Sequence, residues 1–207
     1  ILVSPVFGVM LYILFGKSRI AQAIQNKYAQ VQKESIPFME SKNETIRHLE
    51  ADSPSAAVQS NYIHRYSSFP VHENTTAEYF QVGDDMFPVL IHELEQAQHY
   101  IYIEYFIIND GVMWRTILDI LERKASEGVD VRLIYDGFGC LTTLPYHYDR
   151  FLKEKGIQCQ VFNPFRPLLN IVQNNRDHRK ICVIDGHTGF TGGINLADEY
   201  INQKKRF

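Results

Sequence analysis

Residues 100–135 read YIYIEYFIINDGVMWRTILDILERKASEGVDVRLIY, and their hydrophobic period changes twice. The stretch 100–108 is β-branched and aromatic, which is typical of a buried strand. Residues 109–111 (Asn-Asp-Gly) predict a turn, 114–128 have the apolar spacing and terminal glycine of a helix, and 129–135 predict another strand. Strand, helix and strand in this order indicate an α/β domain.

The alternation continues on both sides of this stretch. Residues 84–97 predict a helix that starts at two aspartates, and residues 146–155 predict a further helix. Residues 157–162 and 178–184 predict two more strands. The fold class that follows is α/β, a layered domain in residues 69–207 with a mixed β-sheet flanked by helices.

Composition and charge exclude several classes of protein. With 207 residues, 45% of them hydrophobic, the chain can bury a core, so a disordered chain is excluded. A net charge of −3 lacks the positive field of a protein that coats nucleic acid, so no nucleic-acid partner is expected. Cys140, Cys159 and Cys182 are spaced neither as metal-ligand pairs nor as a disulfide framework.

Residues 1–16, ILVSPVFGVMLYILFG, carry no charged side chain. As a helix they would span about 24 Å, less than the roughly 30 Å hydrocarbon layer, so we expect the C-terminal part of a transmembrane helix. A buried core helix and a signal-peptide remnant are the alternatives. Four cations precede the first acid, Glu34, which predicts that this flank is cytoplasmic. The four are Lys17, Arg19, Lys27 and Lys33.

Residues 17–68 form a polar segment with Pro37 and Pro54 as breaks. Apolar residues at helical spacing predict one amphipathic helix within a membrane-proximal linker. These residues are Ile20, Ile24, Tyr28 and Val31. A solvated helical linker without lipid contact is the alternative.

The candidate site is residues 178–185, HRKICVID, followed by 191–195, TGGIN. In a strand, residues two apart share a face, so the His178 imidazole and the Lys180 ammonium would project side by side. An imidazole can attack phosphorus, while an ammonium and the Asn195 amide can hold phosphoryl oxygens. The two glycines let the backbone approach an anion. The pattern predicts a phosphate site with a nucleophile; a core histidine is the alternative.

Four acids beside this site have more than one interpretation. Asp185 at the strand end is expected to form a turn with Gly186 and fix the local geometry or an ion pair. Asp198 or Glu199 can orient the imidazole, or simply cap a helix. Glu104 can line the site, or be a buried acid held by an arginine.

The pattern HxKxxxxD followed by GGxN resembles the first of the two HKD motifs of the phospholipase D superfamily. More closely, the chain resembles the bacterial cardiolipin synthases of that superfamily. The resemblance is carried by PVFGVMLYILFG, YFQVGDDMFPVLIHELEQAQHYIYIEYFIINDG, KASEGVDVRLIYDGFG, NNRDHRKICVIDG and FTGGINLADEY. Cys140 departs from the family pattern, which usually has a small hydroxyl residue there.

The resemblance implies a phospholipase D-like fold and an enzyme of the bacterial cell membrane, with its catalytic domain on the cytoplasmic side. Its implied reaction condenses two phosphatidylglycerol molecules to cardiolipin and glycerol through a phosphohistidine formed at His178. No metal and no other cofactor are implied. The implied residues are the catalytic His178, Lys180 and Asp185 and, at the substrate phosphate, Asn195, Gly192 and Gly193.

The leaving alkoxide of this reaction needs a proton, which the family takes from a second HKD histidine. No other histidine of the chain is followed two positions later by lysine. We therefore expect that a C-terminal half with the second motif is missing and that this fragment alone is inactive or nearly so, unless two copies pair. The alternative functions are a homodimeric single-motif phosphodiesterase or nuclease, and a non-catalytic membrane-tethered lipid-binding module.

Overall fold

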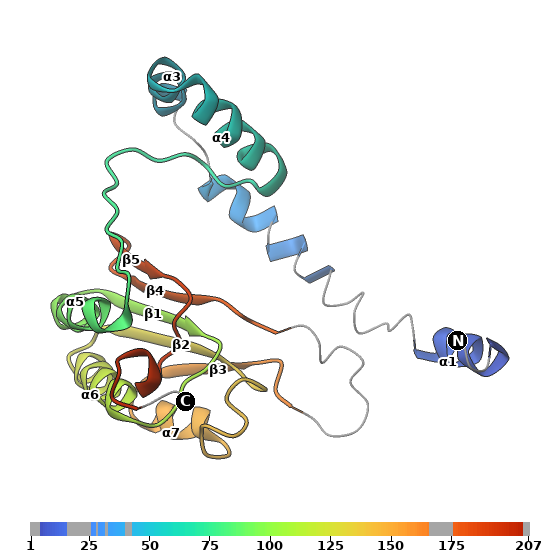
Figure 1. Cartoon of the computed structure of the whole chain (residues 1–207), viewed down its shortest axis with the longest axis vertical. Helices are drawn as coiled ribbons and strands as arrows, with labels where there is room; N and C mark the ends of the chain where they lie inside the picture. Colours follow the sequence, from blue (N-terminus) through green and yellow to red (C-terminus); the bar gives the residue numbers. More distant parts are fainter. Residues whose placement is uncertain are drawn as a thin grey trace. The chain divides into compact units, whose positions relative to one another are not determined.

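The computed structural model describes residues 5–15, 26–27, 29–31, 33–39, 43–165 and 176–204 (Figure 1). The chain divides into two compact units, Ile1–Glu78 and Tyr79–Phe207. The elements of the first unit are α1 (Pro5–Phe15), the 3-10 turn η1 (Ile36–Phe38), α3 (Asn43–Asp52) and α4 (Pro54–Ser67).

All the regular secondary structure described in the first unit is helical, and residues 68–78 at its end form no helix or strand. Pro54 occupies the first turn of α4, where its missing N–H has no intrahelical partner to lose, and Ser53 before it is extended. Among the described helices, none is both long enough and apolar enough to cross a membrane. Ile20, Ile24 and Tyr28 of the expected amphipathic helix lie outside the described residues.

The second unit alternates helices and strands, as the hydrophobic periods predict. Its elements are α5 (Gly83–Gln96), β1 (Tyr100–Tyr105), α6 (Val112–Ser126), β2 (Asp130–Asp136), α7 (Tyr148–Glu154), β3 (Gln158–Phe162), β4 (Lys180–Ile184), β5 (Thr188–Thr191) and the 3-10 turn η3 (Asp198–Tyr200).

Two predicted strands are too long and one strand was not predicted. β1 ends at Tyr105 rather than Ile108, because the chain leaves the ladder and only Ile108 makes a further bridge, to Leu196. β4 begins at Lys180 rather than His178. β5 is short and contains a glycine, so its sequence has little strand character, and its antiparallel pairing with β4 defines it.

The five strands form one mixed sheet in the order β3-β2-β1-β4-β5. β1 pairs with β2, and β2 with β3, in parallel, while β4 runs antiparallel to both β1 and β5. The predicted mixed sheet is therefore confirmed. The antiparallel register sets Lys180, the first residue of β4, opposite Tyr105, the last residue of β1.

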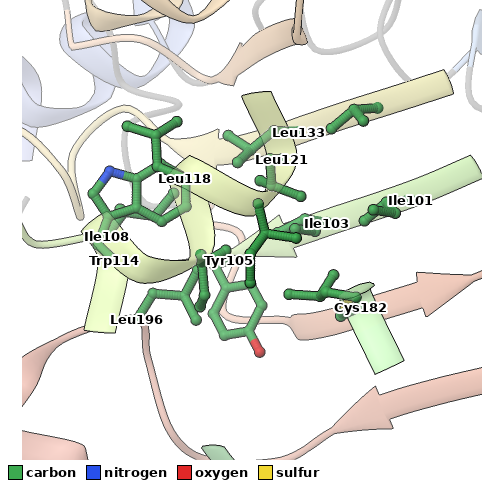
Figure 2. Packing of buried hydrophobic residues seen from close by; sticks show 14 of the residues in the cluster. Ile101, Ile103, Tyr105, Ile108, Trp114, Leu118, Leu121, Leu133, Cys182 and Leu196 are labelled. Atoms are coloured by element: carbon green, nitrogen blue, oxygen red, sulfur yellow. The ribbon is translucent and has the colours of Figure 1, made fainter. Parts of the chain in front are cut away.

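The core lies between one face of this sheet and the helices α5 and α6. Alternate residues of β1 are buried on that face, and Figure 2 shows them together with side chains of α6. The residues concerned are Ile101, Ile103 and Tyr105 of β1 and Trp114, Leu118 and Leu121 of α6. The intervening residues of β1, including Glu104, are only partly buried. Helices thus flank the sheet, as predicted.

The three cysteines belong to this core. Each is a free thiol. Burial raises the thiol pKa of Cys140 to about 11 and those of Cys159 and Cys182 to about 12. Thiols with pKa values so far above neutrality carry almost no thiolate, so we do not expect any of the three to react as a nucleophile.

Candidate active site

Along β4 and the residues just before it, successive side chains point to opposite sides of the backbone. Lys180, Cys182 and Ile184 are buried, and the residues between them are partly exposed. His178 has the same parity as Lys180, and both meet the ring of Phe106. Phe106 is the residue directly after β1.

The Phe106 ring brings the imidazole and the ammonium together. The ring centroids of Phe106 and His178 are 3.9 Å apart with 29° between their planes, and Lys180 Nζ lies 5.2 Å from the Phe106 centroid. Lys180 Nζ also donates a hydrogen bond of 2.7 Å to the backbone carbonyl of His178. His178 itself is exposed, whereas Lys180 is 8% exposed. An accessible imidazole therefore lies beside a largely desolvated cation.

This burial perturbs the ammonium. Desolvation lowers the pKa of Lys180, and the negative charge of Asp177 opposes that shift. Within the described residues, no cluster of three or more histidine, cysteine or acidic side chains is arranged to hold a metal ion.

The residues of opposite parity form an ionic cluster. Arg179 makes ion pairs with Glu104 at 2.5 Å and with Asp177 at 2.9 Å. Burial and a hydrogen bond with Asp177 raise the pKa of Glu104 to about 7. Burial alone would raise the pKa of Asp177, but its hydrogen bonds with Glu104 and Arg179 outweigh this and lower it. Glu104 is thus paired with an arginine, and its place beside a substrate stays a prediction.

Asp136, at the end of β2, is fully buried and holds the chain that leads into His178. Its carboxylate accepts hydrogen bonds from the N–H groups of Phe138 and Gly139, both at 2.8 Å, and of Asp177 at 3.0 Å. The guanidinium of Arg176 adds an ion pair at 3.3 Å. One carboxylate therefore ties the turn after β2 to the residue before His178.

Asp185 lies at the end of β4 that is distant from Lys180. Its carboxylate accepts three hydrogen bonds of 2.8 Å from the backbone N–H groups of Gln98, His99 and Tyr100. The group acts on the backbone at the start of β1. A cavity of about 490 Å³ lies at this end, lined by Asp185 and neighbouring residues; His178 does not line it.

Asn195 is buried and connects two segments beside the site. Its Oδ1 accepts a hydrogen bond of 3.1 Å from the Ile107 N–H, and its Nδ2 donates one of 3.0 Å to the Tyr200 hydroxyl. The amide carries two N–H groups, and the described residues use one of them. A Cβ placed on Gly192 or Gly193 would meet no atom within 4 Å, so both glycines border open space.

The two acids of η3 differ in their surroundings. Asp198 accepts hydrogen bonds from the N–H groups of Val112 at 3.0 Å and Met113 at 2.9 Å, which caps the N-terminus of α6. Glu199 is half-buried in the same turn. Within the described residues, no carboxylate forms a hydrogen bond or ion pair with the His178 imidazole.

Sequence reasoning placed His178, Lys180 and Asn195 in one region but missed Phe106 and Asp177. Phe106 sits in an apolar run where a strand core is the natural interpretation. Its position at the carboxyl end of a predicted strand was the signal that could have suggested a site residue.

Comparison with known proteins matches residues 90–205 to a family described as "Cardiolipin synthase, PLD-like domain". An uncharacterized protein of Streptococcus mutans is 50% identical over 146 residues, which cover 70% of this chain and 32% of that protein. Cardiolipin synthase 1 of Bacillus anthracis is 33% identical over 205 residues, which cover 98% of this chain and 40% of that protein.

The chain thus spans less than half the length of these relatives. Among solved structures, NucT from Helicobacter pylori gives a TM-score of 0.43 with 20% sequence identity, over 58% of this chain and 72% of that one. This structural likeness is too weak to add to the assignment. The family match covers more than half of the 207 residues, and the chain therefore belongs to the phospholipase D-like domain family of the cardiolipin synthases.

Proposed function

We propose that this chain supplies one histidine of a phosphatidyltransferase that converts two phosphatidylglycerol molecules to cardiolipin and glycerol. The observation that carries the proposal is the exposed His178 imidazole held against the same aromatic ring as the buried Lys180 ammonium. Membership of the cardiolipin synthase family supports the choice of a phospholipid substrate.

In the first step a ring nitrogen of His178 forms a bond to the phosphorus of phosphatidylglycerol. The bond from phosphorus to the headgroup glycerol breaks, and the glycerol leaves after taking up a proton. The free headgroup hydroxyl of a second phosphatidylglycerol then attacks the same phosphorus and loses its proton. The P–N bond breaks, which yields cardiolipin and restores the imidazole.

The surrounding groups have complementary roles in these steps. The Lys180 ammonium and the remaining N–H of Asn195 would stabilise the negative charge that develops on the non-bridging oxygens. The open space at Gly192 and Gly193 leaves room for the phosphoryl group. Asp185 acts through the backbone at the start of β1 and does not need to touch substrate.

The alkoxide needs a proton donor that the HKD motif of this chain does not itself supply. The proposal assigns this role to a second histidine of the same kind, from a second motif in a longer polypeptide or from a second copy of this chain.

The proposal includes attachment to the bacterial cell membrane through residues 1–16, with the catalytic unit on the cytoplasmic side. Its support is the uncharged sequence of that segment and the cations that follow it. Membrane fractionation, and protease treatment of sealed vesicles of known orientation, test the attachment and its side separately.

The decisive test is His178→Ala in the full-length enzyme that contains this chain, with His187→Ala, at an exposed histidine just beyond β4, as the matched control. We expect His178→Ala to keep its circular dichroism spectrum and to make no cardiolipin from phosphatidylglycerol vesicles, while His187→Ala keeps most of the activity. Undiminished synthesis by His178→Ala would remove this residue from the chemistry. Cleavage of DNA or RNA, in place of lipid turnover, would favour the phosphodiesterase alternative.

A further inference from the structure

The His178 imidazole is held by an aromatic contact and not by a hydrogen bond from any described side chain. Its ring is exposed, and no described side chain hydrogen-bonds to it. The contact that restricts it is the stack on Phe106, with the centroids 3.9 Å apart. An exposed histidine without such a contact would sample several rotamers, and each would point the ring nitrogens in another direction.

Phe106 is itself fixed through its backbone. The next two residues are held from both sides, because the Ile107 N–H donates to Asn195 Oδ1 and the Ile108 N–H donates to Cys140 Sγ at 3.2 Å. The Cys140 thiol in turn donates weakly to the Phe106 carbonyl at 3.6 Å. The ring therefore extends from an anchored piece of chain.

The ring is also backed by the turn after β2. A Cβ placed on Gly139 would lie 2.3 Å from the Phe106 carbonyl oxygen and 2.9 Å from Cε2 of its ring, so only glycine permits this approach. The Gly139 N–H is bonded to the buried carboxylate of Asp136, which also bonds the N–H of Asp177. The Asp136 carboxylate thus fixes both Gly139, which packs behind Phe106, and Asp177, which precedes His178.

Phe106 contacts the cation as well as the nucleophile. Lys180 Nζ lies 5.2 Å from the ring centroid, within the range in which an aromatic ring attracts a cation. The same ring therefore sets the position of the attacking group relative to the group that would bind the phosphoryl oxygens. A displacement of about 1 Å at such a site can cost on the order of a hundredfold in rate.

We propose that Phe106 is a positioning residue, whose aromatic ring orients the His178 imidazole for attack on the phosphodiester. The inference rests on the proposed function for the identity of the reaction. The orientation of the imidazole can be measured without that reaction.

The first experiment measures the imidazole signals of His178 by NMR in the complete 207-residue chain, assigned through His178→Gln. Protons over the face of an aromatic ring are shielded, so Phe106→Leu should move the His178 ring signals downfield, whereas Phe106→Tyr should leave them near their original position. Phe190→Leu is the matched control, because Phe190 is a half-buried ring of β5 that packs against the same core. If Phe106→Leu fails to fold, Phe106→Met removes the flat ring with less loss of volume.

The second experiment measures turnover of phosphatidylglycerol vesicles by the intact parent protein. We expect Phe106→Leu to lower kcat about tenfold with KM unchanged, and Phe106→Tyr to restore kcat. Unshifted His178 signals in Phe106→Leu, the same shift in Phe190→Leu, or full kcat in Phe106→Leu would overturn the inference. An inactive wild-type parent would instead overturn the proposed function, and the NMR comparison would then decide whether Phe106 orients the imidazole.

Discussion

Single side chains at the start of β4 have two separate chemical environments. His178 and Lys180 meet an aromatic ring, while Asp177 and Arg179 meet the carboxyl of Glu104. In an extended chain, successive side chains point to opposite sides, and this alternation alone separates the two environments. The acidic side chains of Asp177 and Glu104 therefore lie close to His178 without forming a hydrogen bond to its ring.

Glu104→Gln tests the acid cluster through the pH dependence of stability. Because the pKa of Glu104 is about 7 in the folded chain and 4.5 in its ordinary state, the folded chain binds more protons between these values. The contribution of this group to stability therefore falls as the pH rises from about 4.5 to 7. Asp177, whose pKa is lowered, contributes stability above its ordinary pKa of 3.8 and loses it at lower pH, outside this window.

We expect Glu104→Gln to lack this loss, so its stability relative to wild type should increase between pH 5 and pH 8. Urea denaturation of the 207-residue chain at several pH values measures the difference. Glu154→Gln, at an exposed glutamate that ends α7, should follow the wild-type profile. Parallel profiles for Glu104→Gln and wild type would contradict the raised pKa.

Gly193→Ala tests the open space beside the site. A Cβ there meets no atom, and its φ is not in the left-handed region, so the free energy of unfolding should change by less than about 0.5 kcal/mol. If the proposed function holds, cardiolipin synthesis by an enzyme that contains this chain should fall, because the added methyl group would occupy space needed by the phosphoryl group. Unchanged synthesis would show that substrate does not approach this backbone.

At the scale of elements, two acids from the C-terminal part of the chain bond to the backbone at the starts of α6 and β1. Asp198 caps α6 from η3, and Asp185 bonds the N–H groups at the start of β1 from the turn after β4. Each contact joins residues more than eighty positions apart, so each fixes the topology as well as a local end.

Asp198→Ala should therefore lower the free energy of unfolding by about 1 kcal/mol, because two N–H groups at the start of α6 lose their acceptor. Asp198→Asn should keep only part of this stability, since its single amide oxygen can replace one of the two carboxylate acceptors. Denaturant titrations measure both. A change in the imidazole NMR signals of His178 in folded Asp198→Asn would instead indicate that Asp198 acts on the imidazole.

At the scale of the whole molecule, the chain consists of a helical unit and a sheet-containing unit, separated after Glu78. Residues 68–80 between α4 and α5 form no helix or strand, and residues 72–78 are exposed. Segments of this kind are the preferred sites of proteolytic cleavage.

Limited proteolysis should accordingly cut within residues 68–80 first and leave a resistant fragment that begins near Tyr79. Mass spectrometry of the early products identifies the cleavage site. First cuts within β1 or α6 would contradict the division into two units, because both elements belong to the core of the second unit.

The sequence alone was sufficient for the alternation of helices and strands from α5 to β4 and for the grouping of His178 with Lys180, but not for β5. These features depend on side-chain period, glycine and turn signals within short stretches of chain, so they can be recognised locally. The resemblance to the HKD motif added the expectation that His178 attacks phosphorus and that Lys180 binds phosphoryl oxygens.

Only the tertiary structure decided the contacts that position the pair. The stack of Phe106 on His178, the bonds from Asp136 to Gly139 and Asp177, and the cap of α6 all join segments far apart in sequence. The order of strands in the sheet determines which of these segments meet. That order results from burial of the whole core, and local propensity does not specify it.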